Sequence, residues 1–137
     1  MSDAYVDTDV LIRLLTGDDQ GKQRAAAALF EDVEHGARTL VAPDTVIADA
    51  VFVLSSPRIY NRPRTEVRDL LEVLVRLPGF RVDNKAVVLE ALDLFATSNL
   101  DFGDAMIVAG MRRDGTAVLY SYDRDFDRFP DLLRTEP

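Results

Sequence analysis

The sequence contains no cysteine and only one histidine, and this scarcity excludes several kinds of site. The histidine, His35, lies in a polar stretch, and nothing around it resembles a reactive centre. The thiolate and imidazole ligands typical of zinc, copper and iron–sulfur sites are therefore missing. A Ser-His-Asp or Cys-His nucleophile is excluded as well, unless His35 serves it. Because no disulfide can stabilise the fold, the composition fits a reducing compartment.

Long apolar runs and an excess of basic residues are also absent. No run approaches the roughly 18 residues of a membrane span, and the start of the sequence lacks the basic segment of an export signal. We therefore expect a soluble cytoplasmic protein with no membrane partner, folded as one domain over residues 1–137. A net charge of -8 argues against a protein that coats nucleic acid with a basic face. It leaves room for a nuclease, because a divalent metal can neutralise an acidic active site.

Four carboxylates stand beside or inside apolar segments, where an unpaired negative charge is costly. They are Asp7 after residues 4–6, Asp49 within 46–54, Asp104 before 105–109 and Asp123 after 117–120. Lysine and arginine are absent from these apolar segments, so we expect a bound cation to compensate the charges. The available metal ligands are therefore oxygen atoms, which suit magnesium, manganese or calcium. Because magnesium commonly binds substrate phosphates too, the sequence predicts a metal site that acts on a phosphate ester.

Short apolar strands alternate with longer helical patterns, which is typical of βα units and a mostly parallel sheet. Strands are predicted at residues 3–7, 39–42, 80–82 and 117–121, with helices between them. Ligands of such sheets bind beyond the carboxyl ends of the strands, where Asp7 and Asp123 stand. We expect Asp104, at a helix start, and Asp49, on a flanking helix, to reach the same crevice. The predicted helix caps are Thr8 or Asp9, Asp44 or Thr45, and Asp83.

Four segments together resemble a PIN domain, and more narrowly a VapC-type ribonuclease toxin. They are residues 5–13, the apolar helix that carries Asp49, residues 100–105 and residues 120–126. The resemblance covers nearly the whole chain, with the motifs in the usual order and at the usual spacing. It implies a three-layer α/β/α sandwich around a central, mostly parallel sheet. It also implies Mg²⁺- or Mn²⁺-dependent cleavage of RNA, a homodimer, and inhibition by a small antitoxin protein.

The resemblance assigns roles to individual residues. Asp7, Asp49, Asp104 and Asp123 match the four acids of the family, and Asp7, Asp104 and Asp123 are the expected metal ligands. The expected supporting residues are Thr8, Asp9, Ser121, Asp101 and Asp125, and the candidate phosphate contacts are Arg13, Arg112, Arg113 and Arg124. Two positions depart from the family, which commonly has Glu at position 49 and Asn at position 9. The hypothesis for the mechanism is hydrolysis of an RNA phosphodiester by a metal-activated water.

Other interpretations of the same residues stay open. Asp104 also suits a helix cap, Asp123 suits an Asx-turn, and each arginine suits a solvated surface charge. Residues 7–11 also fit the opening motif of haloacid-dehalogenase-like phosphatases, although Val108 stands where that family has a second later acid. The last alternative is a PIN-like binding module that has lost turnover and acts through RNA or a protein partner.

Overall fold

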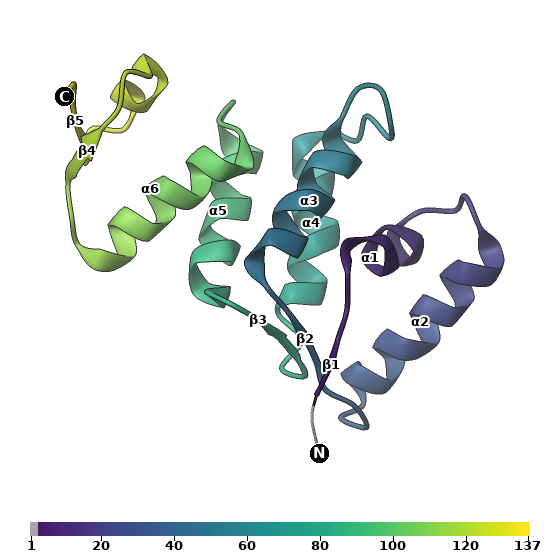
Figure 1. Cartoon of the computed structure of the whole chain (residues 1–137). Helices are drawn as coiled ribbons and strands as arrows, with labels where there is room; N and C mark the ends of the chain where they lie inside the picture. The colour runs from purple at the N-terminus through teal and green to yellow at the C-terminus, as the bar shows by residue number, and fades with distance from the viewer. Residues whose placement is uncertain (1–2) are drawn as a thin grey trace.

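The structure, a computed structural model, describes residues 3–137, which form short strands and longer helices (Figure 1). In chain order the elements are β1 Ala4–Tyr5, α1 Thr8–Leu15, α2 Gln20–Glu34, β2 Leu40–Ala42, α3 Asp44–Ser55, α4 Arg64–Val75, β3 Phe80–Val82, α5 Lys85–Thr97, α6 Phe102–Asp114, β4 Val118–Tyr120, the 3-10 helix η1 Arg124–Arg128, and β5 Leu133–Thr135. The predicted strands are present at their expected places: β3 has the predicted bounds, and the other three are shorter than predicted. The last strand, β5, was not predicted from the sequence.

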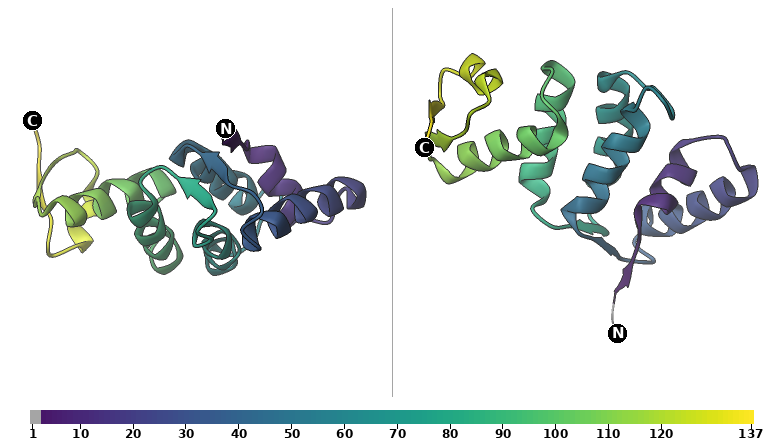
Figure 2. Two further views of the ribbon diagram at one scale, coloured as in Figure 1. Left: turned by 90° about the horizontal axis from the view of Figure 1, so that it is seen from below. Right: turned by 45° about the horizontal axis from the view of Figure 1, so that its top comes forward.

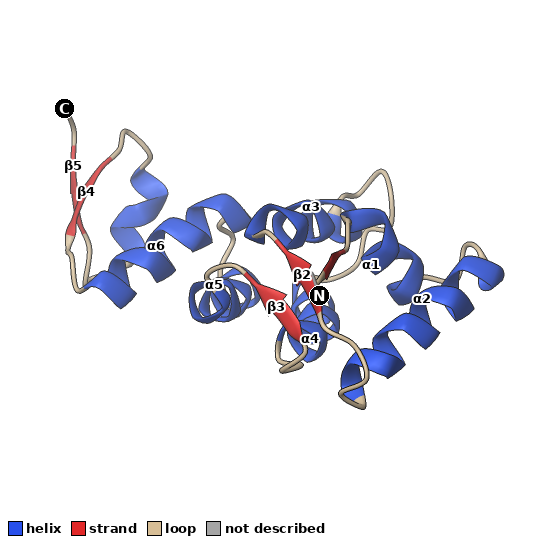
Figure 3. Ribbon diagram, turned by 60° about the horizontal axis from the view of Figure 1, so that its bottom comes forward, coloured by secondary structure: helices blue, strands red, loops and turns tan. Residues whose placement is uncertain are grey.

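The first sheet is parallel, with the strand order β1-β2-β3. Ala4 lies opposite Leu40, which in turn lies opposite Phe80. Figure 3 shows α3 on one face of this sheet and α4 and α5 on the other. Helices must cover both faces because parallel strands need crossover connections. The predicted α/β class with a parallel sheet is confirmed.

The second sheet contains only β4 and β5, which pair in parallel with Val118 opposite Leu133. It lies beyond α6, at the opposite end of the molecule from α2 (Figures 1 and 2). The sequence predicted a fourth strand within one central sheet, whereas the structure places this strand beside β5. Strand propensity is a local property and pairing is not, so the sequence pattern did not reveal the partner.

The hydrophobic core lies between the first sheet and helices α3, α4 and α5. Phe80 of β3 is fully buried, and its ring meets that of Phe30 from α2 edge to face, with 5.4 Å between the ring centroids. Burying a side chain of this size contributes about 2 to 3 kcal/mol. In contrast to β2 and β3, which bury alternate residues, β4 has no buried residue.

The helix caps differ from those predicted. Thr8 and Asp9, Asp44 and Thr45, and Asp83 do not serve as N-caps: the caps of α1, α3 and α5 are Asp7, Pro43 and Asn84. Asp19, Asp101 and Asp123 cap α2, α6 and η1. The N-cap of α1 needs an extended backbone one residue before the first helical turn, and Asp7 meets this requirement because β1 ends at Tyr5.

Arg64 holds the loop between α5 and α6. Its guanidinium Nη1 donates to the carbonyl oxygens of Phe95 at 2.9 Å and Leu100 at 2.6 Å. The same group lies 4.1 Å from the centre of the Phe95 ring. Burial lowers the pKa of Arg64, and the charge of Asp101 opposes this effect. Arg64 therefore ties the start of α4 to the end of α5 and to the loop that leads into α6.

Candidate functional site

Asp7 follows the carboxyl end of β1, an edge strand whose outer side pairs with no other strand among residues 3–137. Its backbone is extended, and its Oδ1 accepts a hydrogen bond from the Val10 amide at 3.2 Å. The carboxylate is exposed to solvent and borders an apolar groove of about 520 Å³. The groove is lined by Tyr5, Val6, Asp7, Val10, Leu29 and Val46. The cap hydrogen bond uses one carboxylate oxygen and leaves the other available to a ligand.

The residues next to Asp7 are engaged with the protein. The Thr8 hydroxyl donates to the Val46 carbonyl at 3.4 Å and so links α1 to α3. Asp9 forms an ion pair with Arg13, with 3.5 Å between Oδ1 and Nε. The distance fits an ion pair. However, the buried Nε of Arg13 forms no hydrogen bond with any group in residues 3–137. Arg13, a predicted phosphate contact, therefore already has a carboxylate partner.

Asp104 lies in the first turn of α6, beside the helix cap Asp101. Asp101 Oδ1 accepts a hydrogen bond from the Asp104 amide at 2.8 Å. Burial raises the pKa of Asp104 above its usual range. Nearby carboxylates raise this pKa further: Asp101, Asp123 and Asp125. The structure thus brings four predicted site residues into one negatively charged group, and their like charges repel one another.

Asp123 follows β4 and begins η1. Its Oδ1 accepts a hydrogen bond from the Asp125 amide at 2.9 Å, which is the geometry of an Asx-turn. The Ser121 hydroxyl oxygen accepts from the Asp123 amide at 3.0 Å and so fixes the backbone of the turn. Arg134, which the sequence analysis did not single out, donates to the Ser121 carbonyl at 3.1 Å. The sequence around Arg134, a basic residue on a short strand, did not predict this hydrogen bond.

Asp49 is exposed on α3, between the two groups of acids. Val46, one turn earlier on the helix, lines the groove beside Asp7. Ala48 and Phe52 line a second hollow that Asp101 and Gly103 border. Neither Asp7 nor Asp49 contributes to the raised pKa of Asp104. Asp49 therefore sits between the two halves of the predicted site.

The model of the PIN domain family matches residues 4–132, which is most of the chain. The chain belongs to the PIN domain family. This is a family of nucleases, and its members typically use divalent metals. No curated protein matches the chain in sequence. In the part of the chain that the structure describes, no helix is both long and apolar enough to cross a membrane.

Asp7 does not join the acids around Asp104 within one chain. Among residues 3–137, no three carboxylate or histidine groups are arranged to hold a metal ion. The donor chemistry suits magnesium or manganese, but Asp7 is separated from the group around Asp104. In this arrangement one chain does not fit the metal that the family typically uses.

The predicted phosphate contacts of the PIN domain differ in their availability. Arg112 binds Asp131 through two hydrogen bonds of 2.8 and 3.2 Å. It also lies 3.7 Å from Glu90. The hydrogen bonding that Arg112 donates to Asp131 is the largest cause of the raised pKa of Arg112. Arg113 and Arg124 are exposed and, within residues 3–137, form no ion pair. They are the better placed of the four to contact a phosphate.

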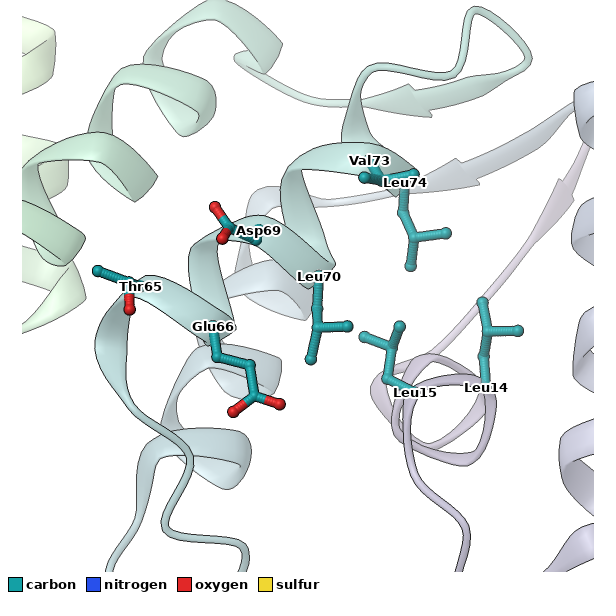
Figure 4. A pocket seen from close by; sticks show the side chains of 8 residues that line it. All are labelled: Leu14, Leu15, Thr65, Glu66, Asp69, Leu70, Val73 and Leu74. Carbon is teal, nitrogen blue, oxygen red and sulfur yellow. The ribbon is translucent and has the colours of Figure 1, made fainter.

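A further hollow of about 530 Å³ lies between α1 and α4 (Figure 4). Leu14 and Leu15 of α1 face Leu70 of α4 across it, while Glu66 lies at its border. None of the predicted site acids lines this hollow. Its two carboxylates, Glu66 and Asp69, already form ion pairs with Arg62 and Arg68, so we do not assign the active site to it.

Proposed function

We propose that this PIN domain is a metal-dependent endoribonuclease and the toxin of a toxin–antitoxin pair, inhibited by a small antitoxin protein. The family match over residues 4–132 carries the proposal. The acids support it, because Asp7 and Asp123 follow the carboxyl ends of β1 and β4, where ligands of parallel sheets bind. Burial is the largest cause of the raised pKa of Asp104, and the charges of Asp101, Asp123 and Asp125 add to it, which supports the proposal because carboxylates that gather to bind a cation repel one another.

The residues that would bind Mg²⁺ or Mn²⁺ are Asp7, Asp104 and Asp123, once they are brought together. Arg113 and Arg124 supply positive charge for an RNA phosphate without first having to break an ion pair within residues 3–137. The family match favours this assignment over the phosphatase interpretation of residues 7–11.

The test is cleavage of a mixed RNA panel by purified protein in magnesium, manganese or EDTA. We expect Asp7→Asn to abolish metal-dependent cleavage, because an amide is a poor ligand for a hard cation. The fold should survive, since Asn accepts the hydrogen bond from the Val10 amide as well as Asp does. The matched control is Asp83→Asn, which changes an exposed acid that follows β3. Cleavage by Asp7→Asn at the wild-type rate would contradict the assignment.

The separation of Asp7 from the Asp104 group favours a second candidate, a PIN-domain binding module without turnover. Asp49→Glu distinguishes the two functions, because the longer side chain reaches further toward the crevice. For the nuclease we expect Asp49→Glu to cleave faster than the wild type. RNA binding without cleavage by the wild type and by Asp49→Glu, in either metal, would favour the binding module.

A further inference from the structure

Among residues 3–137, four strands have one edge without a partner strand, namely β1, β3, β4 and β5, and two of these edges, on β1 and β4, carry exposed tyrosines. β1 pairs only with β2, and β4 pairs only with β5. The outer edge of each therefore presents unpaired backbone groups, which readily accept another strand. Tyr5 on β1 is 75% exposed and Tyr120 on β4 is 68% exposed. These fractions are high for aromatic side chains in a sheet, where such residues usually pack against a neighbour.

The surfaces beside the two edges are both apolar. The groove beside β1 is walled by Val6, Val10, Leu29 and Val46. Residues 102–137, here called the C-terminal unit, present Ile107, Val118, Tyr120 and Leu133, each at least 43% exposed. Large apolar side chains that gather at a strand edge mark an interaction site. The groove and the C-terminal unit therefore both present apolar surface that another apolar surface could cover.

The position of the C-terminal unit points to a second copy of the chain as the occupant of the groove. Figures 1 and 3 place the strands of the unit at one end of the molecule and β1 near its middle, with α5 and β3 between them. α6 is anchored against α5 through buried Ala105 and Val108, and Arg64 holds the loop before it. To reach β1 of its own chain, the unit would have to give up these contacts. It can reach β1 of another copy with the contacts intact.

We propose that two copies of the chain exchange the part of their C-terminal units that follows α6, while each α6 stays packed against α5 of its own chain. β4 of each copy then pairs in parallel with β1 of the other, which gives a five-stranded sheet in the order β3-β2-β1-β4-β5. Parallel pairing places Asp123, which follows β4, beside Asp7 of the other copy, which follows β1. Asp101, Asp104 and Asp125 belong to the same chain as this Asp123. The acid site is thus shared between two chains, and this catalytic consequence rests on the proposed nuclease function.

Cross-linking tests the exchange without any measurement of activity. Because the chain has no cysteine, the variant Tyr5→Cys/Tyr120→Cys carries thiols only on β1 and β4. A short bismaleimide should convert it to covalent dimers, seen by mass under denaturing conditions. The control Ile59→Cys/Tyr120→Cys, with a thiol in the exposed turn after α3, should stay monomeric. A cross-link within one chain, or no cross-link between residues 5 and 120, would overturn the proposal.

Complementation tests the shared site. Asp7→Asn and Asp123→Asn chains are mixed, unfolded and refolded together, and cleavage is compared with that of each variant alone. Random pairing makes half of the dimers mixed, and each mixed dimer has one intact site, so we expect about a quarter of the wild-type rate. A mixture as inactive as the single variants, beside an active wild type, would overturn the shared site. If the wild type itself cleaves no RNA, the nuclease proposal fails and the cross-link alone decides the exchange.

Discussion

The body of the molecule, residues 3–101, and the C-terminal unit are held together in different ways. In the body, β2 and β3 bury Leu40 and Phe80 almost completely. In the unit, the parallel strands β4 and β5 bury no residue, and beyond α6 only Phe126 is buried among the described residues. Strands of similar length and composition thus reach opposite degrees of burial. The difference teaches that burial follows from the partner surface and not from the strand itself.

Polar contacts stabilise the C-terminal unit, whereas apolar packing stabilises the body. Arg112 of α6 binds Asp131, and its guanidinium lies 5.6 Å from the centre of the Phe129 ring. Arg134 of β5 binds Asp127 at 2.9 Å. Partly exposed ion pairs of this kind contribute up to about 1 kcal/mol each. The unit should therefore open more readily than the body.

The largest expected effect comes from the body. Phe80→Ala removes a ring that is fully buried against Phe30, and we expect the free energy of unfolding to fall by about 3 to 5 kcal/mol. Urea denaturation followed by circular dichroism measures this change. The control Val73→Ala truncates a side chain that is 67% exposed and should change the free energy by less than about 0.5 kcal/mol. Equal losses in the two variants would remove the contrast between core and surface.

An intermediate effect is expected at the junction between body and unit. Arg64→Ala leaves the carbonyls of Phe95 and Leu100 without their donor, and we expect a loss of about 2 to 3 kcal/mol in the free energy of unfolding. The matched control is Arg58→Ala, which removes an exposed guanidinium from the turn after α3. Thermal unfolding compares the two variants. Should Arg64→Ala prove no worse than Arg58→Ala, the junction would not depend on this residue.

The smallest effect is expected within the unit and depends on pH. The hydrogen bond from Arg112 lowers the pKa of Asp131 below its usual value. A lowered pKa stabilises the folded protein above the unfolded-state value and loses this contribution as pH falls through the folded-state value. Asp131→Asn should therefore unfold at a slightly lower temperature than the wild type at neutral pH. Below the lowered pKa the two should unfold together, and a gap that persists or widens in acid would contradict this role.

The sequence by itself determined the local and the chemical features of this protein. The apolar patterns placed the first four strands and the helices between them, because periodicity records which side of a segment is buried. The ordered motifs around Asp7, Asp49, Asp104 and Asp123 indicated the PIN family, which the match over residues 4–132 confirms. The roles of these residues as metal ligands stay predictions.

Only the tertiary structure decided which elements meet. It assigned Asp7, Asp101 and Asp123 to cap hydrogen bonds, which depend on where each helix begins to within one residue. It paired β4 with β5 and left the outer edge of β1 unpaired, although the same patterns suit one continuous sheet. The physical reason is that strand pairing and charge proximity join residues far apart in the chain. A local sequence pattern does not show which distant strand or charge will be the partner.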